Sequence, residues 1–256
     1  MLEVIPVSAF HDNYIWLIRP GDSSKVAIVD PGDAGPVLVA LADAGLSPGA
    51  ILITHHHGDH VGGVRQLLDH YQVPVYGPAR ESIPGRTHAL KGGDSIELPD
   101  LGLSFRILDV PGHAAGNIAY YGHGCLFIGD TLFMSGCGRL FEGTARQMYD
   151  SLQKLLALPD DTRIFCAHEY TQANLRFAHA VEPDNAAITE RMASSEALRQ
   201  QNHPTVPGTL AVERETNPFL RADQATVAAA AEKFAGHALH NPVEVFAAIR
   251  SWKDGF

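Results

Sequence analysis

The sequence predicts an α/β fold that is followed by a helical C-terminal part. Up to about residue 168, short runs rich in Val and Ile are punctuated by Pro-Gly pairs and alternate with helical patterns. After that point the pattern becomes helical and rich in alanine. A third observation concerns chemistry: the stretch 54–60, Thr-His-His-His-Gly-Asp-His, directly follows the apolar run 51–53. Potential metal ligands therefore stand where a buried strand ends.

The first half of the chain is predicted to consist mainly of strands. Residues 2–7, 14–18 and 25–29 are short and β-branched, and Pro20-Gly21 and Pro31-Gly32 bound them, so we expect them to open a sheet. The order strand, helix, strand, helix follows. The pattern predicts helices at 36–44 and 64–71, and strands at 50–53, 73–76, 95–98 and 103–108.

The last third of the chain is predicted to be helical. Turn-forming residues at 182–185 and 202–204 separate its segments. The composition changes near Tyr170, and we therefore expect two domains, one at 1–169 and a helical one at 170–256. The predicted helices are 171–181, 186–201, 224–234 and 242–253.

Composition limits the class of protein. With 256 residues and 45% hydrophobic content, the chain can bury one large core, or one core and a small accessory domain. The net charge of -10 and the lack of a basic run argue against a nucleic-acid surface. Neither a signal peptide nor a membrane span is apparent, so a soluble cytoplasmic protein is expected. A monomer is the default expectation, although the sequence does not settle the oligomeric state.

The cysteines indicate no disulfide framework. There are three of them, too few and too scattered for such a framework. Cys125 and Cys166 lie in apolar runs and are expected in the core. Cys137 lies between glycines and is expected in a tight turn.

The motif at 54–60 predicts metal binding. In an extended backbone, residues two apart point the same way, so His55 and His57 can bind one ion. Asp59 and His60 follow the Gly58 turn and are expected to point elsewhere, which allows one segment to serve two adjacent ions. An expression tag or a solvated turn is the alternative, but tags lie at termini and this motif is internal. Imidazole and carboxylate ligands suit zinc, iron and manganese.

Three further candidate ligands occupy similar positions. His113, Asp130 and His168 each follow an apolar, strand-like run, at 105–110, 125–128 and 164–167. Ligands of sheets covered by helices bind beyond the carboxyl ends of strands, so these ends are expected to converge. A lone histidine is more often a hydrogen-bonded structural residue. The candidate ligand set is His55, His57, Asp59, His60, His113, Asp130 and His168.

The motif 54–60, together with Gly112-His113, Gly129-Asp130 and His168, resembles the metallo-β-lactamase superfamily. That resemblance implies an αββα sandwich with a two-metal site between the sheets. Other stretches resemble the glyoxalase II family of hydroxyacylglutathione hydrolases and imply its C-terminal α-helical domain. These stretches are 135–144 (Ser-Gly-Cys-Gly-Arg-Leu-Phe-Glu-Gly-Thr), 167–171 (Ala-His-Glu-Tyr-Thr) and 250–254 (Arg-Ser-Trp-Lys-Asp).

The same resemblance implies a role for each ligand. His55, His57 and His113 would hold the first metal, and Asp59, His60 and His168 the second, with Asp130 as the bridge. The cofactors would be two divalent ions, with zinc favoured and iron or manganese as alternatives.

The resemblance also implies a binding site for the glutathione moiety. It would be formed by Arg139, Tyr170, Arg250 and Lys253, with Phe141 as an apolar contact where some members carry tyrosine. The alternative for Arg250 and Lys253 is an ordinary solvated helix face.

The function implied is metal-dependent hydrolysis of S-(2-hydroxyacyl)glutathione. For S-D-lactoylglutathione the products would be glutathione and D-lactate, in the second step of methylglyoxal detoxification. Two divalent ions, two carboxylates and one hydroxide leave a net charge of about +1, which favours a developing oxyanion. We hypothesise that a metal-bridging hydroxide attacks the thioester carbonyl, so that no separate catalytic side chain is needed. No Gly-x-Ser-x-Gly motif is present.

Three other functions compete with this one. A persulfide dioxygenase of the same superfamily uses a single iron, but that family lacks a comparable helical domain. A metallo-β-lactamase characteristically has a Cys ligand where this chain has Asp130. A non-enzymatic metal-binding module would leave Arg250 and Lys253 unexplained.

Several nearby residues have two interpretations. Asp30 either orients a metal ligand or forms a turn, and Glu169 is equally open. His56 is expected to point away from its neighbours as a loop residue.

Overall fold

The computed structural model describes residues 2–256, which form two compact units. One unit contains the chain up to Val110 together with Ala114–Gly129, and the other contains Pro111–His113 together with Asp130–Phe256. Both units combine strands and helices. The division into domains at 1–169 and 170–256 stays a prediction, and its first residue lies outside the described range.

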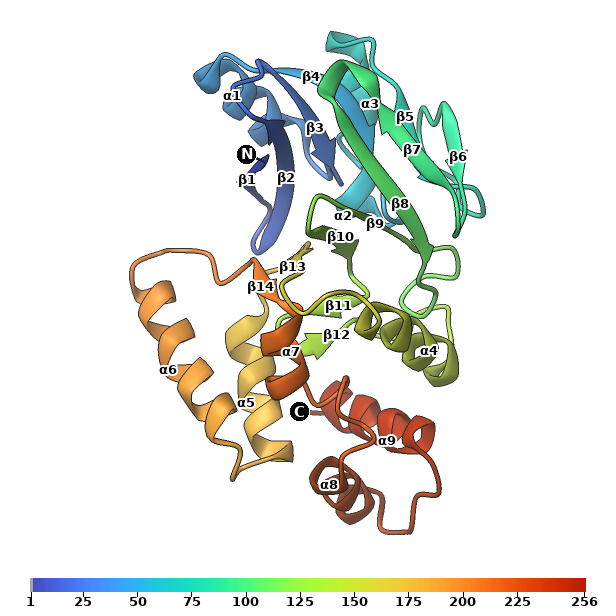
Figure 1. Cartoon of the computed structure of the whole chain (residues 1–256), viewed down its shortest axis with the longest axis vertical. Coiled ribbons are helices and arrows are strands. Elements are labelled where there is room, and N and C mark those ends of the chain that lie inside the picture. The colour runs from blue at the N-terminus through green and yellow to red at the C-terminus, as the bar shows by residue number, and fades with distance from the viewer. Residues whose placement is uncertain (1) are drawn as a thin grey trace. The chain divides into compact units, whose positions relative to one another are not determined.

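The first unit contains a sheet with the strand order β1-β2-β3-β4-β5-β6. Its first three strands pair antiparallel, whereas β3 to β6 pair in parallel. Parallel neighbours need a crossover, and the helix between β3 and β4 supplies it (Figure 1). The strands are β1 (Leu2–Ala9), β2 (Asn13–Pro20), β3 (Lys25–Val29), β4 (Ser47–Leu52), β5 (Val75–Pro78) and β6 (His88–Leu90).

Helices cover one face of this sheet and bury its core. Helix α1 (Ala34–Ala44) begins at Asp33, whose side chain accepts a hydrogen bond from the Gly35 backbone N–H, and it ends at Gly45 in the left-handed conformation. Helix α3 (Val64–His70) adds further apolar side chains. The resulting cluster includes Ile15, Leu17, Ile28, Val37, Leu41, Ile51, Val64 and Leu67.

A second set of strands in the first unit forms an antiparallel meander in the order β10-β9-β8-β7. The Tyr120 hydroxyl donates to the Ile53 carbonyl at 2.9 Å, and the Ile118 N–H donates to the Thr54 carbonyl at 3.0 Å. The meander therefore fixes the backbone where β4 leads into the histidine motif. Its strands are β7 (Ser95–Leu98), β8 (Leu103–Asp109), β9 (Ile118–Gly122) and β10 (Cys125–Gly129), with the 3-10 helix η1 (Pro99–Leu101) between the first two.

The second unit is mainly helical. Its strands form two short antiparallel pairs, β11 (Leu132–Phe133) with β12 (Gly136–Cys137) and β13 (Arg163–Cys166) with β14 (Gly208–Thr209). Within this unit α5 contacts α6 and α8, and α9 contacts both α8 and α4 (Figure 1). The helices are α4 (Ala145–Leu156), α5 (Thr171–Val181), α6 (Ala186–Gln200), α7 (Leu210–Thr216), α8 (Ala225–Ala235) and α9 (Pro242–Asp254).

Most predicted elements are confirmed. The strands at 25–29 and 95–98 and the helix at 171–181 match β3, β7 and α5 residue for residue. The strand predicted at 73–76 begins two residues later, at Val75, because only from there does it pair with β4.

Three substantial elements are absent from the prediction: α4, α7 and β9. The sequence does contain a signal for the start of α4, because Thr144 and Gln147 form a capping box. The cysteines are all buried, and Cys137 lies in the short strand β12 rather than in the turn itself.

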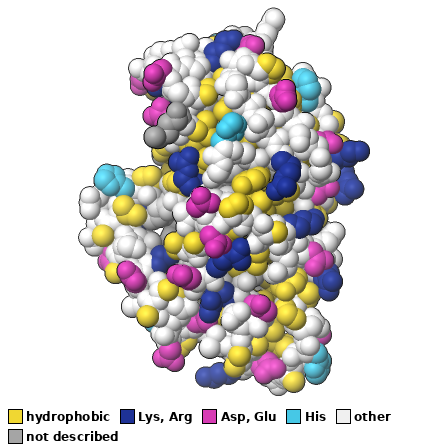
Figure 2. All heavy atoms as spheres, in the orientation of Figure 1, with side chains coloured by type: hydrophobic (Ala, Val, Ile, Leu, Met, Phe, Trp, Pro, Cys, Tyr) yellow, Lys and Arg dark blue, Asp and Glu magenta, His cyan; other side chains and the backbone are white. Residues whose placement is uncertain are grey.

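The surface mixes charges of both signs. On the face drawn in Figure 2, Lys and Arg side chains alternate with Asp, Glu and apolar side chains and do not form one continuous patch. None of the described helices combines the length and the apolar character that crossing a membrane requires.

Phe246 on α9 tests the helical packing of the second unit. Its side chain is fully buried, and its ring lies 5.6 Å from that of Phe219. We expect Phe246→Ala to lower the free energy of unfolding by about 3–5 kcal/mol, because it removes buried contacts and leaves a cavity. Urea denaturation followed by fluorescence measures the loss. Leu198→Ala, at a 39% exposed position, is the control, and an equal loss there would contradict the packing argument.

Candidate metal-binding groups and active-site cavity

The histidine motif begins at Thr54, which is held from two sides. The Thr54 backbone N–H donates to Asp30 Oδ1 at 2.8 Å, and its hydroxyl donates to Asp30 Oδ2 at 2.6 Å. Asp30 itself is only 3% exposed and has a positive φ of 49°. Three hydrogen bonds to its carboxylate, the third from His60, offset the cost of this backbone conformation. Asp30 thus orients the motif, which decides between the two interpretations of this residue.

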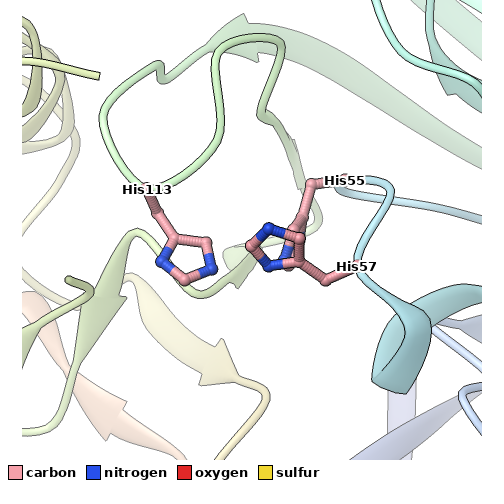
Figure 3. Close-up of side chains that lie close together, drawn as sticks. All are labelled: His55, His57 and His113. Carbon is pink, nitrogen blue, oxygen red and sulfur yellow. The ribbon is translucent and has the colours of Figure 1, made fainter. Parts of the chain in front are cut away.

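His55 and His57 turn ring nitrogens toward each other. Their Nε2 and Nδ1 atoms lie 3.1 Å apart, and both rings project from the loop after β4 (Figure 3). Because the Thr54 hydroxyl gives its proton to Asp30, it accepts the proton of His55 Nδ1 at 3.0 Å. The Nε2 atom of His55 therefore carries a lone pair. Two ring nitrogens this close together can bind one cation.

His60 and Asp59 lie on the single turn of α2 (Gly58–Val61). The Nδ1–H of His60 donates to Asp30 Oδ2 at 3.0 Å, which leaves Nε2 as the nitrogen that could bind a metal. That nitrogen is 3.5 Å from Asp59 Oδ2, which accepts a hydrogen bond from the Asn13 amide. The rings of His55 and His60 are 4.0 Å apart, a spacing compatible with ligands of two adjacent ions.

The second unit carries the other three candidate ligands on separate loops. His113 lies on the loop after β8 (Figure 3), Asp130 directly follows β10, and His168 follows β13. The His113 Nδ1–H donates to the Arg139 carbonyl at 3.0 Å, again leaving Nε2 for a metal. The Nε2 atoms of His113 and His168 lie 3.5 Å and 3.3 Å from Asp130 Oδ2. One carboxylate oxygen thus faces two imidazole nitrogens.

Glycines precede two of the candidate ligands at positions where the backbone packs closely against neighbouring residues. Gly129, just before Asp130, has a φ of 55°, and a Cβ there would lie 2.3 Å from Thr54 Oγ1. Gly112, just before His113, has a φ of 153° and would place a Cβ 2.7 Å from that of Met148. No larger residue fits either position without displacing its neighbours.

Both groups fit divalent transition metals. Each offers imidazole nitrogens and at least one carboxylate, and in His55, His60 and His113 the other ring nitrogen already has an acceptor. Those acceptors fix the tautomer before a metal binds. His56 is not part of this pattern, since its Nδ1 lies 3.1 Å from Glu81 Oε2.

The second unit also contains a cavity of about 520 Å³, a size typical of small-molecule sites. Tyr170 in its wall stacks on the ring of His168, with centroids 4.7 Å apart. The Phe141 ring lies 5.2 Å from that of His113. The cavity is lined by all five predicted contact residues, Arg139, Phe141, Tyr170, Arg250 and Lys253, and also by His113 and Asp130.

Arg250 is part of the cavity wall. It is only 5% exposed and donates to the Cys137 carbonyl at 2.8 Å and to Asp254 Oδ1 at 3.0 Å. Its guanidinium lies over the ring of Phe219. The alternative of an ordinary surface charge is therefore wrong for this residue. Burial raises the pKa of the neighbouring Cys137 thiol to about 11, so that thiol stays protonated near neutral pH.

Lys253 is a perturbed base in the same cavity. Its pKa is lowered from 10.5 to about 8, first because burial penalises the ammonium and then because Arg250, Arg176 and Arg139 repel its charge. Its Nζ donates to the Ala173 carbonyl at 3.3 Å.

Side chains of the helices hold the segment between Asp130 and Arg139. Asn217 donates to the carbonyls of Phe133 and Gly136, and Asn174 donates to that of Met134. No local sequence pattern predicted these positioning residues, because their partners are distant in the chain.

Glu213 completes this support. Its fully buried carboxylate accepts from the Ser135 N–H at 2.8 Å and forms an ion pair with Arg191. Ser135 has a φ of 54°, an unfavourable conformation that these contacts hold in place. Nothing in the local sequence around Glu213 indicated that it would support this segment.

Comparison with known proteins identifies the family. Residues 10–168 match the model of the metallo-beta-lactamase superfamily, and residues 169–256 match the model named "Hydroxyacylglutathione hydrolase C-terminus". The hydroxyacylglutathione hydrolase of Nitrosomonas eutropha is 54% identical over the full length of both chains. That of Alkalilimnicola ehrlichii is 58% identical over 99% of each chain.

The chain belongs to the hydroxyacylglutathione hydrolase family. This membership confirms the family predicted from the motifs. It also makes the chain an enzyme of the hydrolase class.

Solved structures confirm the fold class. ETHE1 from Myxococcus xanthus matches with a TM-score of 0.67 and 22% identity over 99% of this chain and 98% of its own. The di-iron-bound form of TTHA1623 matches with a TM-score of 0.59 and 29% identity over 84% of this chain and all of its own. The α/β class, with a metallo-β-lactamase αββα sandwich and a C-terminal helical domain, is thus established for this hydroxyacylglutathione hydrolase homologue.

Asp30→Asn tests how the first group is oriented. An amide cannot match the charged acceptor that His60 and Thr54 share, so we expect the affinity for zinc to fall by about 10–100-fold. Competition with a chromogenic chelator measures that affinity. Asp33→Asn is the matched control, because Asp33 caps α1 and Asn serves equally well as a cap. Equal affinities in the two variants would contradict the orienting role.

Proposed function

We propose that this chain hydrolyses the thioester of S-(2-hydroxyacyl)glutathione at a centre of two divalent metal ions. The observation that carries the proposal is the cavity of the second unit. Its lining combines two candidate metal ligands, His113 and Asp130, with the three cations Arg139, Arg250 and Lys253. Family membership over the full chain supports the same reaction.

In this proposal seven side chains hold the metals. His55, His57 and His113 would bind one ion, Asp59, His60 and His168 the other, and Asp130 both. When bound, such ions polarise a carbonyl oxygen and lower the pKa of water to about 7, so that hydroxide is available near neutral pH. Zinc is the ion we propose, and the same ligands accept iron or manganese. A di-iron form is known for the similar TTHA1623.

The chain's own contribution is to bind and orient the substrate. Glutathione carries two carboxylates, and the cavity offers cations to receive them. The Arg139 side chain is 62% exposed, and the Lys253 ammonium donates one hydrogen bond, to the Ala173 carbonyl, so both can donate further hydrogen bonds to a substrate. Arg250 already donates to the Cys137 carbonyl and to Asp254, so it contributes mainly its charge.

Aromatic side chains would place the rest of the substrate. Phe141 and Tyr170 lie against the rings of His113 and His168 respectively. A glutathione chain passing between them would bring its thioester toward the metal ligands. Because Phe141 has no hydroxyl, its contact with the substrate is apolar.

The proposed products are glutathione and a 2-hydroxy acid. For S-D-lactoylglutathione the acid is D-lactate, and the reaction is the second step of methylglyoxal detoxification. A cytoplasmic monomer belongs to the same proposal.

Removal of metal tests the reaction directly. The purified protein is assayed for thioester loss from S-D-lactoylglutathione, before and after exhaustive chelation. We expect activity to fall at least 100-fold on chelation and to return with zinc, because the ions supply the nucleophile. Undiminished turnover in metal-free protein would end the proposal. Oxygen uptake with glutathione persulfide, in place of thioester loss, would indicate a dioxygenase.

The pKa of Lys253 predicts how substrate affinity depends on pH. As pH rises through about 8, Lys253 loses its proton and its attraction for a carboxylate. We expect the Kd of the non-hydrolysable thioether S-hexylglutathione to be constant below pH 7 and to rise up to about tenfold per pH unit above 8. Calorimetry at pH 6.5 to 9.5 measures it. Lys253→Arg keeps its charge and should remove most of the rise. An unchanged rise in that variant would assign it to another group.

A further inference from the structure

One acidic side chain in the cavity lies outside the candidate ligand set. Asp254 ends α9, and its Oδ1 atom lies 3.0 Å from Arg250 Nη2 and 3.5 Å from Arg139 Nε. Its side chain is 44% exposed, so it stays accessible from solvent. The lining therefore carries three cationic side chains and, besides Asp130, this single acidic side chain.

The contacts of Asp254 leave part of its carboxylate available. Both guanidinium contacts involve Oδ1. Within residues 2–256 no protein donor reaches Oδ2. A carboxylate oxygen has two lone pairs, so Oδ2 can accept hydrogen bonds from a ligand while Oδ1 keeps its two arginine contacts.

The charges of the cavity complement those of a glutathione thioester. The γ-glutamyl residue has a carboxylate and an ammonium on one carbon, and the glycine end has a second carboxylate. Arg139, Arg250 and Lys253 suit the two carboxylates. None of these cations can receive the ammonium, whereas Asp254 can.

We propose that Asp254 recognises the ammonium group of the γ-glutamyl residue and thereby determines specificity for glutathione conjugates. This inference rests on the proposed function and names the group that selects its substrate class. The carboxylate works in two ways. It accepts from the ammonium, and its negative charge between two guanidiniums disfavours ligands that have carboxylates but no ammonium.

A purely structural role is the competing explanation for Asp254. Asp254 lies four positions after Arg250 on the same helix, and because its side chain is 44% exposed, solvent screens the pair and limits its contribution to stability. Asparagine would keep an oxygen acceptor for Arg250, so Asp254→Asn removes the charge with little effect on the helix. The two explanations therefore differ in whether the variant alters discrimination between substrates.

The experiment compares two substrates with two proteins. One substrate is S-D-lactoylglutathione, and the other is its des-amino analogue, in which a glutaryl group replaces the γ-glutamyl residue. In the zinc-loaded wild type we expect kcat/KM for the analogue to be about tenfold lower or more, because a charge-assisted hydrogen bond is lost. In Asp254→Asn the two values should agree within about twofold, because the partner of the ammonium has gone.

Controls separate the outcomes. Asp161→Asn makes the same charge change at an exposed position outside the cavity and should keep the tenfold preference of the wild type. Equal losses on both substrates in Asp254→Asn would show a structural role and overturn the inference. Equal rates on both substrates in the wild type would overturn it as well, whether or not the variant folds.

Failure of the proposed function would look different. In that case the wild type would hydrolyse neither thioester. Calorimetric titration with S-hexylglutathione and its des-amino analogue would still test Asp254, since binding needs no turnover. Equal Kd values for the two thioethers in the wild type would then overturn the inference.

Discussion

An imidazole can bind a metal only through a nitrogen that has lost its proton, and this constraint organises both ligand groups. The proton must reside on the other nitrogen, which then needs an acceptor nearby. His60 uses the Asp30 carboxylate, His55 uses the Thr54 hydroxyl, and His113 uses the Arg139 carbonyl. Asp30 holds two of these three histidines, one of them through Thr54. A buried aspartate with a positive φ therefore orients two of the candidate ligands.

The helices of the second unit act as a support for the segment after Asp130. That segment has little regular structure, so its backbone polar groups need partners from elsewhere. Asn174 on α5, Glu213 on α7 and Asn217, directly after α7, supply these partners. Another helix of this unit, α9, contributes Arg250 and Lys253 to the cavity wall. The support and the proposed substrate contacts thus come from helices of one unit, and changes in helix packing are expected to affect binding as well as stability.

Local charge in the cavity opposes the charge of the whole chain. The chain has a net charge of -10, yet three cations gather around one cavity. Burial lowers the pKa of Lys253, and repulsion by the neighbouring guanidiniums lowers it further. Asp254 offsets part of the positive charge by lying against two of these guanidiniums. A binding site for a ligand with two carboxylates must hold like charges together before the ligand arrives. The Asp254 carboxylate reduces the repulsion between these charges and can also bind the single ammonium of the ligand.

The sequence by itself determined the class of the fold and the ligand types, because both depend on local pattern. Strands such as 25–29 and 95–98 follow from β-branched runs between turns, and His55, His57, Asp59 and His60 are adjacent in the chain. The positions of His113, Asp130 and His168 after apolar runs marked them as further candidates, and the family motifs then supplied the contact residues, which spacing alone would not have linked. Boundaries shifted where strand pairing decided them, as in β5.

Only the tertiary structure decided what each side chain touches. The three hydrogen bonds of Asp30, the bond from Arg250 to the Cys137 carbonyl and the bond from Ser135 to Glu213 join residues that are 24 or more positions apart. Such contacts arise from packing of the whole unit, and no local pattern encodes them. The sequence shows which chemical groups are present, whereas the fold determines their protonation, their partners and which of their donors remain for a substrate.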